Sequence, residues 1–190
     1  FNVYEDNRYT LHLNTGFSLP TGSIDERDTT PAGYMRLPYP MQPGSGTFDL
    51  LPSITCRGQK NDWSWGTQAG ATLHLGENSH HYRLGHAYRL TGWSTHHLND
   101  VISLSLRLDG TYRGDVHGAD PLLSPMMAPT ARADLRGGTQ LDGLVGLTLQ
   151  PPQWQGHQLA IEAATPLYRH LNGPQLETDW HLTVGWQGTF

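Results

Sequence analysis

The chain has 190 residues, enough for a single domain, and its formal net charge of −5 argues against nucleic acid as its main partner. Only 36% of the residues are apolar, the mean hydropathy is −0.50, and no apolar run reaches the ~18 residues that a transmembrane helix needs. The single cysteine, Cys56, excludes an internal disulfide.

From the N-terminus onwards, apolar and polar side chains alternate in eight segments, and a period of two predicts β-strands. Residues 1–8 are a polar lead-in without this pattern. The predicted strands cover residues 9–19, 48–56, 63–75, 82–90, 102–113, 141–149, 159–167 and 180–190. Successive alternating segments are typical of antiparallel hairpins, so the sequence predicts an all-β fold.

The two longest predicted connections are separated by an even number of strands, which decides where they lie. If neighbouring strands are antiparallel, the Pro-rich connections 21–46 and 114–138 lie at one end, together with 76–80 and 168–175. The connections at the other end are short and cover residues 57–60, 93–99 and 151–156. Outer-membrane barrels have this asymmetry, whereas a sandwich gives no reason for it. The sequence therefore predicts one antiparallel transmembrane β-barrel domain over residues 1–190, with 21–46 and 114–138 as long extracellular loops.

The last predicted strand has one apolar face. Trp180, Leu182, Val184 and Trp186 lie at every second position, and the chain ends at Phe190. Such a strand can line the core of a sandwich, form a soluble edge strand, or face lipid on a barrel with a wet interior. Aromatic rings collect at membrane interfaces, which favours lipid. The strand resembles the C-terminal strand of bacterial outer-membrane proteins, which ends in an aromatic residue that the barrel-assembly machinery reads.

The same alternation assigns side chains to two faces. The residues predicted to face the membrane are Leu104, Leu106, Leu108, Leu147, Ile161, Leu182, Val184, Trp186 and Phe190. The residues predicted to line the barrel interior are Asp49, Gln68, His74, Arg83, Arg89, Arg107, Asp109, Asp142, Glu162, Asp179 and His181. In a barrel of about eight strands, opposed Arg and carboxylate groups would plug the narrow interior. In a wider barrel the same groups would line a channel.

Eleven histidines raise the question of a metal site. The pairs His80–His81 and His96–His97 lie close to His86 in the sequence, and Met126–Met127 could supply soft ligands for copper. Adjacent residues on a strand point to opposite faces, so His80–His81 would not chelate together unless they lie in a turn. No His-x-x-x-His pattern and no Cys pair is present. We therefore expect polar loop and interior residues, with no metal and no organic cofactor.

Two other functions stay open beside a channel. Some outer-membrane barrels hydrolyse lipids with a Ser, a His and a polar orienting group. Ser64, Ser103 and Ser105 lie on predicted strands but should face inward, and no Gly-x-Ser-x-Gly is present, so we do not expect an enzyme. The other alternative is a structural barrel with a plugged interior that binds a partner through its two long loops.

Five stretches are distinctive as a set. They are residues 19–25 (LPTGSID), 39–50 (YPMQPGSGTFDL), 63–68 (WSWGTQ), 82–85 (YRLG) and 166–176 (PLYRHLNGPQL). Together they resemble the outer-membrane barrel proteins named for the meta-pathway of phenol degradation, which are described as transporters. The chain departs from that pattern at Pro43, where the family has Leu after the Met-Gln pair.

This resemblance implies a porin-like or transporter-like barrel in the outer membrane of a Gram-negative bacterium, surrounded by lipid and passing small organic solutes, aromatic ones included. Members of the family are usually longer, with barrel-like sequence ahead of the motif at residues 19–25. The resemblance thus implies, as an alternative to a barrel of about eight strands, the C-terminal part of one of about twelve. An outer-membrane protein needs a signal peptide, which we expect to have been removed or to lie upstream.

Overall fold

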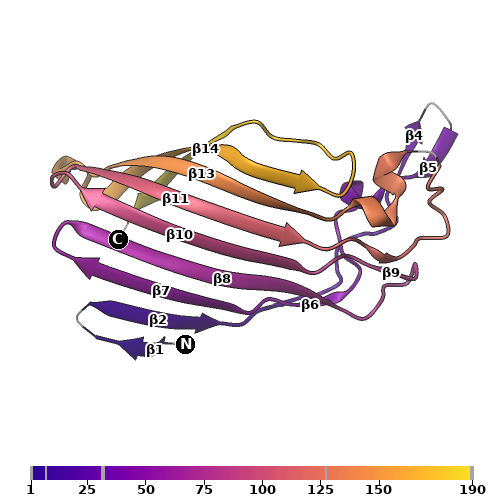
Figure 1. Ribbon diagram of the computed structural model, residues 1–190, viewed down its shortest axis with the longest axis horizontal. Helices are drawn as coiled ribbons and strands as arrows, with labels where there is room; N and C mark the ends of the chain where they lie inside the picture. Colours follow the sequence, from indigo (N-terminus) through magenta and orange to yellow (C-terminus); the bar gives the residue numbers. More distant parts are fainter. Residues whose placement is uncertain (1, 7, 31–32, 127, 189–190) are drawn as a thin grey trace.

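The protein is all-β and is built on one long antiparallel sheet (Figure 1). The computed structural model describes residues 2–6, 8–30, 33–126 and 128–188. The strand order is β1 (Asn2–Glu5), β2 (Tyr9–Asn14), β7 (Ser53–Lys60), β8 (Trp63–Leu75), β10 (Ala87–His97), β11 (Ile102–Arg113), β13 (Gly138–Leu149), β14 (His157–Leu171) and β15 (His181–Gly188). Two short strands, β3 (Phe17–Ser18) and β6 (Phe48–Leu50), pair with each other, and β6 also pairs with β8.

The eight strands predicted from the alternation are all present, although several of their ends differ. The first is divided into β2 and β3, and the second into β6 and β7, with Pro52 at the second break. Proline cannot donate a backbone hydrogen bond to the neighbouring strand, which explains that break. The predicted all-β, antiparallel fold is confirmed.

Several local predictions are wrong. Residues 57–60 and 168–171, predicted to lie in connections, belong to the strands β7 and β14. Asn2–Glu5 is the strand β1, paired with β2, and not part of a polar lead-in. The fourth predicted strand starts too early, because Tyr82–Arg83 forms a separate strand, β9, and β10 begins only at Ala87. At its other end β10 continues to His97, through residues predicted to connect two strands. There the apolar face carries Gly92, Ser94 and His96, so the alternation that identifies a strand is lost.

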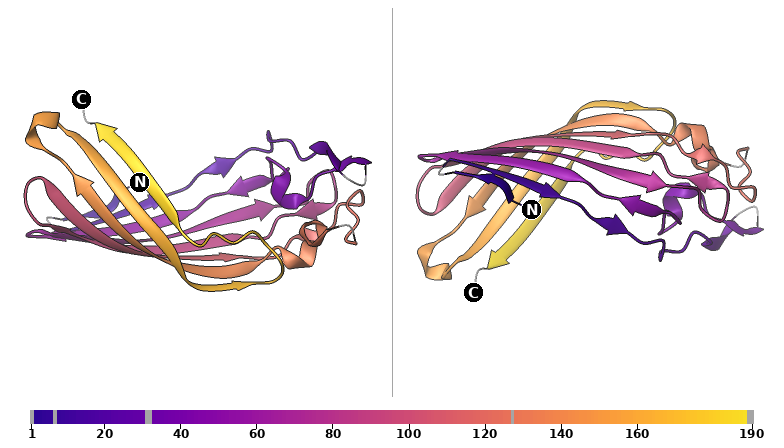
Figure 2. Two further views of the ribbon diagram at one scale, coloured as in Figure 1. Left: turned by 90° about the horizontal axis from the view of Figure 1, so that it is seen from above. Right: turned by 90° about the horizontal axis from the view of Figure 1, so that it is seen from below.

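Figure 2 shows that the sheet is bent into a trough, with its middle strands at the bottom and its first and last strands rising on the same side. The strands β1 and β15 are the two edges and do not pair with each other. The described residues therefore form an open, curved sheet, and the predicted closure into a barrel is not seen in them.

The connections are sorted by length, as predicted. At one end of the sheet β7 and β8, β10 and β11, and β13 and β14 are joined by short segments, the last of which contains η4 (Pro152–Trp154). At the other end lie the long segments 19–47 and 114–137, with the shorter 76–86 and 172–180 (Figure 1, right). Asp179, predicted to line the interior, lies in the segment 172–180 and is exposed.

The long segments contain short elements of their own. These are β4 (Arg27–Thr30), β5 (Gly33–Arg36), η1 (Tyr39–Met41), β9 (Tyr82–Arg83), β12 (His117–Gly118), η2 (Pro129–Ala131) and η3 (Ala133–Leu135). Strands β4 and β5 form a hairpin, and β9 pairs with β12. These segments pack together around the buried side chains of Tyr39, Tyr82 and Val116. No helix among the described residues is long and apolar enough to cross a membrane.

Candidate functional site

The two faces of the sheet differ in polarity and in exposure. Leu106 and Val184, on the apolar face, are 65% and 61% exposed, whereas Asp109 and Thr91, on the polar face, are 9% and 5% exposed. The polar face is thus the more buried one, as expected for the inside of a curved sheet. The strand register places on the apolar face Leu104, Leu106, Leu108, Leu147, Ile161, Leu182, Val184 and Trp186. Phe190, predicted to join them, lies outside the described residues.

Aromatic side chains gather at the two ends of the apolar face. Near the short turns, Tyr9 packs edge-on against Trp65, with ring centroids 6.3 Å apart, and Trp154 lies 5.0 Å from Trp186. Trp63 stacks on His96 in the same region, with ring centroids 4.4 Å apart. Near the long loops, Tyr88 and Tyr112 lie 6.1 Å apart on neighbouring strands, and Tyr168 is exposed on β14. Between these two bands the exposed residues are mostly Leu, Ile and Val.

Glycines on the strands make room for two of the tryptophan rings. A Cβ atom at Gly58 would lie 2.7 Å from the ring of Trp65, which covers it on the apolar face. A Cβ atom at Gly66 would overlap the ring of Trp93, which lies on the polar face. Both rings therefore lie over a glycine, where a larger side chain would collide with them.

Opposed charges cross the polar face, as the alternation predicts. The guanidinium of Arg89 donates two hydrogen bonds to the carboxylate of Asp109, at 2.8 and 2.7 Å. Arg107 Nε lies 3.2 Å from Glu162 Oε2. Asp142 lies directly opposite Asp109 on β13 and accepts from the amide of Gln140 at 2.8 and 3.0 Å.

The remaining predicted interior residues are more scattered. Gln68 donates to Thr55 Oγ1 at 2.9 Å on the polar face, and His181 is exposed at the start of β15. His74 is buried beside Asp49, with His74 Nδ1 2.7 Å from Asp49 Oδ1. Arg83 lies apart from the main sheet, on β9.

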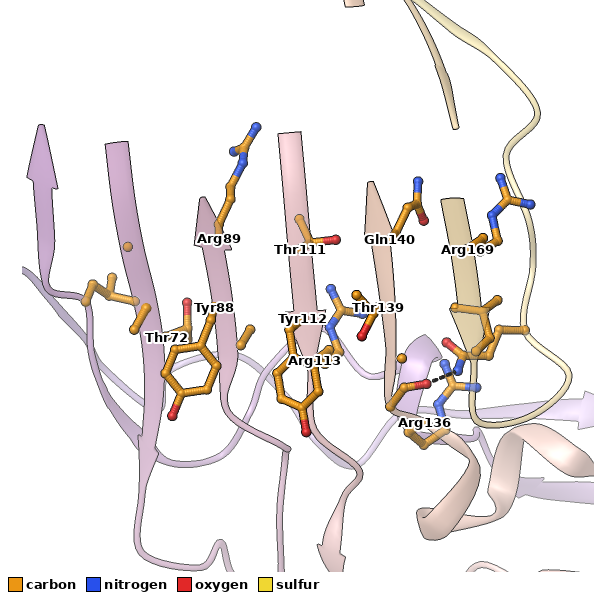
Figure 3. A pocket seen from close by; sticks show the side chains of 18 of the residues that line it. Thr72, Tyr88, Arg89, Thr111, Tyr112, Arg113, Arg136, Thr139, Gln140 and Arg169 are labelled. Carbon is orange, nitrogen blue, oxygen red and sulfur yellow. Dashed lines mark hydrogen bonds between the residues drawn. The ribbon is translucent and has the colours of Figure 1, made fainter. Parts of the chain in front are cut away.

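A cavity of about 550 Å³ opens on the polar face, at the end of the sheet near the long loops (Figure 3). Arg89, Thr111, Gln140 and Arg169 lie in one row on four successive strands. The side chains of this row point the same way in Figure 3, and the rings of Tyr88 and Tyr112 point the other way. The arginines that line the cavity are Arg89, Arg113, Arg136 and Arg169, and no Asp or Glu is among its described lining residues.

Sequence reasoning did not single out three of these four arginines. Arg113 continues the polar alternation of Arg107 and Asp109, so the pattern contained a usable signal. The strand β14 contains an irregularity opposite Leu141 and Asp142, and this breaks the alternation of side chains after Pro166. The sequence pattern therefore predicts a loop at Arg169, although the residue lies on the strand. Arg136 lies in the segment 114–137, where no periodicity assigns a direction.

The long loops are held together by a buried ion pair. Arg36 donates to Asp120 at 2.6 Å, both side chains are buried, and Arg36 also donates to the exposed Asp25 at 2.6 Å. The backbone N–H of Asp120 donates to the hydroxyl of Tyr39 at 3.1 Å. Burial raises the pKa of both Tyr39 and Tyr82, so both stay neutral at physiological pH.

Several histidine side chains make hydrogen bonds to neighbouring residues. The backbone N–H of His74 donates to His86 Nδ1 at 3.2 Å, and burial, with the nearby Arg83, lowers the pKa of His86. No group of three metal-ligating side chains occurs within the described ranges. Met127, a suggested copper ligand, is outside them.

One serine–histidine pair lies near the short turns. His97 Nδ1 is 2.8 Å from Ser103 Oγ, beside a cavity of about 260 Å³. Within the part of the chain that the structure describes, no carboxylate is hydrogen-bonded to the other nitrogen of His97. The arrangement therefore lacks the group that orients the histidine in a catalytic triad. No model of a known protein family matches the chain, and a search of curated proteins finds no match.

Proposed function

We propose that this protein is a channel or transporter-like β-barrel of the bacterial outer membrane that passes small organic compounds. In this proposal the curved sheet is part of a closed transmembrane barrel. Its apolar face contacts lipid, its polar face lines the interior, and the long loops lie outside the cell. The strand β15 is the segment through which the barrel-assembly machinery would recognise the chain.

The observation that carries the proposal is the exposed apolar face with an aromatic band at each end. Leucine side chains such as Leu106 and Leu108 are more than half exposed, so in water this face would be a large uncovered apolar surface. Outer-membrane barrels have an apolar outer band flanked by aromatic girdles, with side chains alternating between lipid and interior. The central strands, 11 to 15 residues long, are sufficient to cross a bilayer when tilted.

Two further points support transport of small organic solutes. The resemblance to the phenol meta-pathway barrels favours small organic solutes, aromatic ones included. The cavity of about 550 Å³ on the polar face is large enough for such a molecule. The contacts described above require neither covalent chemistry nor a cofactor.

Reconstitution tests the proposed function. We expect the purified protein to insert into liposomes and to let small organic solutes through, measured as swelling or as release of a trapped dye. A variant with Leu106→Arg and Leu108→Arg on the apolar face should insert poorly, because each arginine near the bilayer midplane costs about 2–4 kcal/mol. Arg107→Leu, on the opposite face of the same strand, is the matched control and should still insert.

A second function is favoured by a separate observation. Ion pairs cross the polar face, and the loops are packed around Tyr39, Tyr82 and Val116 at one end. A barrel filled in this way would be a structural protein that binds a partner through its loops. Protein that inserts into liposomes but leaves them sealed to solutes would favour this alternative over a channel.

A further inference from the structure

The cavity near the long loops has an unbalanced positive charge. Arg89 is paired with Asp109, and Arg169 donates to Glu177 at 2.5 Å. Arg113 and Arg136 make no ion pair with any described carboxylate. Two of the four guanidinium groups that line the cavity are thus without a partner of opposite charge in the described part of the chain.

Arg136 is the more constrained of these two. Its Nη1 atom is buried, and none of the described residues accepts a hydrogen bond from it. A buried donor without an acceptor costs about 1–3 kcal/mol, and more for a charged group. Burial and the nearby Arg113 also lower the pKa of Arg136. An anion between Arg113 and Arg136 would supply the missing acceptor and relieve the repulsion between the two cations.

The backbone of Arg136 is fixed by its neighbours. The carboxylate of Asp115 accepts from the backbone N–H groups of Arg136 and Gly137, at 3.0 and 2.5 Å. Its second oxygen accepts from Asn172 at 2.7 Å. Asp115 therefore binds the backbone of this segment and does not neutralise the Arg136 side chain. This leaves the guanidinium available to a ligand.

The rest of the lining indicates the kind of anion. Leu171 contributes apolar surface near the two arginines, because it lies opposite Gly138, which lies opposite Arg113. Leu51 and Pro52 line the far side of the same cavity. Guanidinium groups bind carboxylates through paired hydrogen bonds. Small-molecule sites typically combine apolar walls with a few polar groups in a volume of about 300–1,000 Å³.

We propose that this cavity binds a small organic carboxylate, with its charged group at Arg113 and Arg136 and its apolar body against Leu171. The proposal rests on the proposed function, because it names the solute class that the interior would admit. Inorganic phosphate lacks an apolar body and should bind more weakly.

Calorimetric titration of the purified protein in detergent micelles tests the site. The probes are cyclohexanecarboxylate, its neutral amide and inorganic phosphate. We expect the carboxylate to bind most tightly, and Arg113→Gln and Arg136→Gln each to weaken it about tenfold or more, as expected for loss of one charge-assisted hydrogen bond. Arg132→Gln is the matched control, since Arg132 lies outside the cavity and pairs with Asp134. It should bind like the unchanged protein.

The inference is overturned if the amide or phosphate binds as well as the carboxylate, or if both cavity variants bind like Arg132→Gln. Arg113 is exposed, so Arg113→Gln keeps the test valid even if Arg136→Gln fails to fold. Binding in micelles does not require transport. Carboxylate binding without solute flux in liposomes would therefore retain the site and reject the channel, and flux without binding would do the reverse.

Discussion

Arg89 and Asp109 are unequal partners in their ion pair. The Arg89 side chain is 60% exposed, whereas that of Asp109 is 13% exposed and lies opposite the carboxylate of Asp142. Like charges directly opposite each other on paired strands destabilise a sheet. The arginine therefore contributes mainly by offsetting the charge of a carboxylate that has little access to water.

We predict that Arg89→Ala lowers the free energy of unfolding by about 1–3 kcal/mol, because it leaves the hydrogen-bond acceptors of Asp109 unpaired. Urea unfolding measures the free energy of unfolding of each variant, with the same detergent or lipid used for all of them. Arg132→Ala, which removes an exposed arginine from its pair with Asp134, should cause no measurable change. Equal effects of the two substitutions would contradict this account of the polar face.

Single residues were predictable from the sequence where the alternation is unbroken. Asp109, Asp142 and Glu162 share a face because a regular strand turns every second side chain the same way. The pairing of Arg36 with Asp120 could not be predicted, because 84 residues separate the two and both lie in segments without periodicity. Which residues of two loops come into contact depends on how the loops fold against each other. No local sequence pattern encodes that arrangement.

Within the strands, glycine has two different roles. At Gly66 the absent side chain leaves space for the ring of Trp93, whereas a Cβ atom at Gly185 would meet no atom within 4 Å. We predict that Gly66→Ala destabilises the sheet by about 1–3 kcal/mol through overpacking. Gly185→Ala should stabilise β15 by about 0.5–1 kcal/mol, since glycine weakens a strand interior. The measurement is the thermal unfolding midpoint of each variant. A higher midpoint for Gly66→Ala would refute the packing described for Trp93.

The loop segments form a unit that should open separately from the sheet. We predict that Asp120→Asn, which removes one partner of a buried ion pair, costs the loops about 3–5 kcal/mol. Limited proteolysis should then cut within residues 19–47 and 114–137 while the circular dichroism of the strands is unchanged. Asp25→Asn alters an exposed carboxylate that contacts both Arg36 and His80, and should cost less than about 1 kcal/mol. Equal protease sensitivity of the two variants would contradict the idea that the buried Arg36–Asp120 pair is the main contact between the two loop segments.

The two buried tyrosines give this unit a pH dependence. Burial raises the pKa of Tyr39 and Tyr82 above the usual value of about 10, so the neutral phenol is the form that the folded loops favour. Their contribution to stability is complete below about pH 10 and is lost as the pH rises through the raised pKa. Ultraviolet titration should show that a fraction of the tyrosines ionises at a higher pH than exposed tyrosines do. Tyr82→Phe should make this fraction smaller. An unchanged fraction in that variant would contradict the burial of Tyr82.

Elements were easiest to predict in the middle of the sheet. The strand β11 has an unbroken apolar and polar alternation, and its predicted bounds, 102–113, are those observed. The second half of β10 was not predicted because Gly92, Ser94 and His96 stand on the apolar face. The strands β1 and β9 have only four and two residues, too few to show an alternation. In such segments strand pairing is decided by the neighbouring strand, and the sequence of the segment alone is insufficient.

At the scale of the whole molecule, the order and direction of the strands were predictable, but the closure of the sheet was not. Alternation and loop lengths give the antiparallel order from β2 to β15. Closure depends on whether the two edge strands can pair, and that depends on strand number, tilt and stagger together. The described sheet is curved but open between β1 and β15, and we propose that it is part of a closed barrel in the membrane.

The most direct test of that proposal is the environment of four consecutive positions on β11, residues 106–109. With Cys56→Ala as the background, a nitroxide label is attached to each of Leu106→Cys, Arg107→Cys, Leu108→Cys and Asp109→Cys in liposomes. Electron paramagnetic resonance then measures how accessible each label is to a lipid-soluble and to a water-soluble relaxing agent. We predict that labels at 106 and 108 meet the lipid-soluble agent and those at 107 and 109 the water-soluble one. Equal access of the water-soluble agent to all four labels, in a protein that stays dispersed without detergent, would contradict a membrane location.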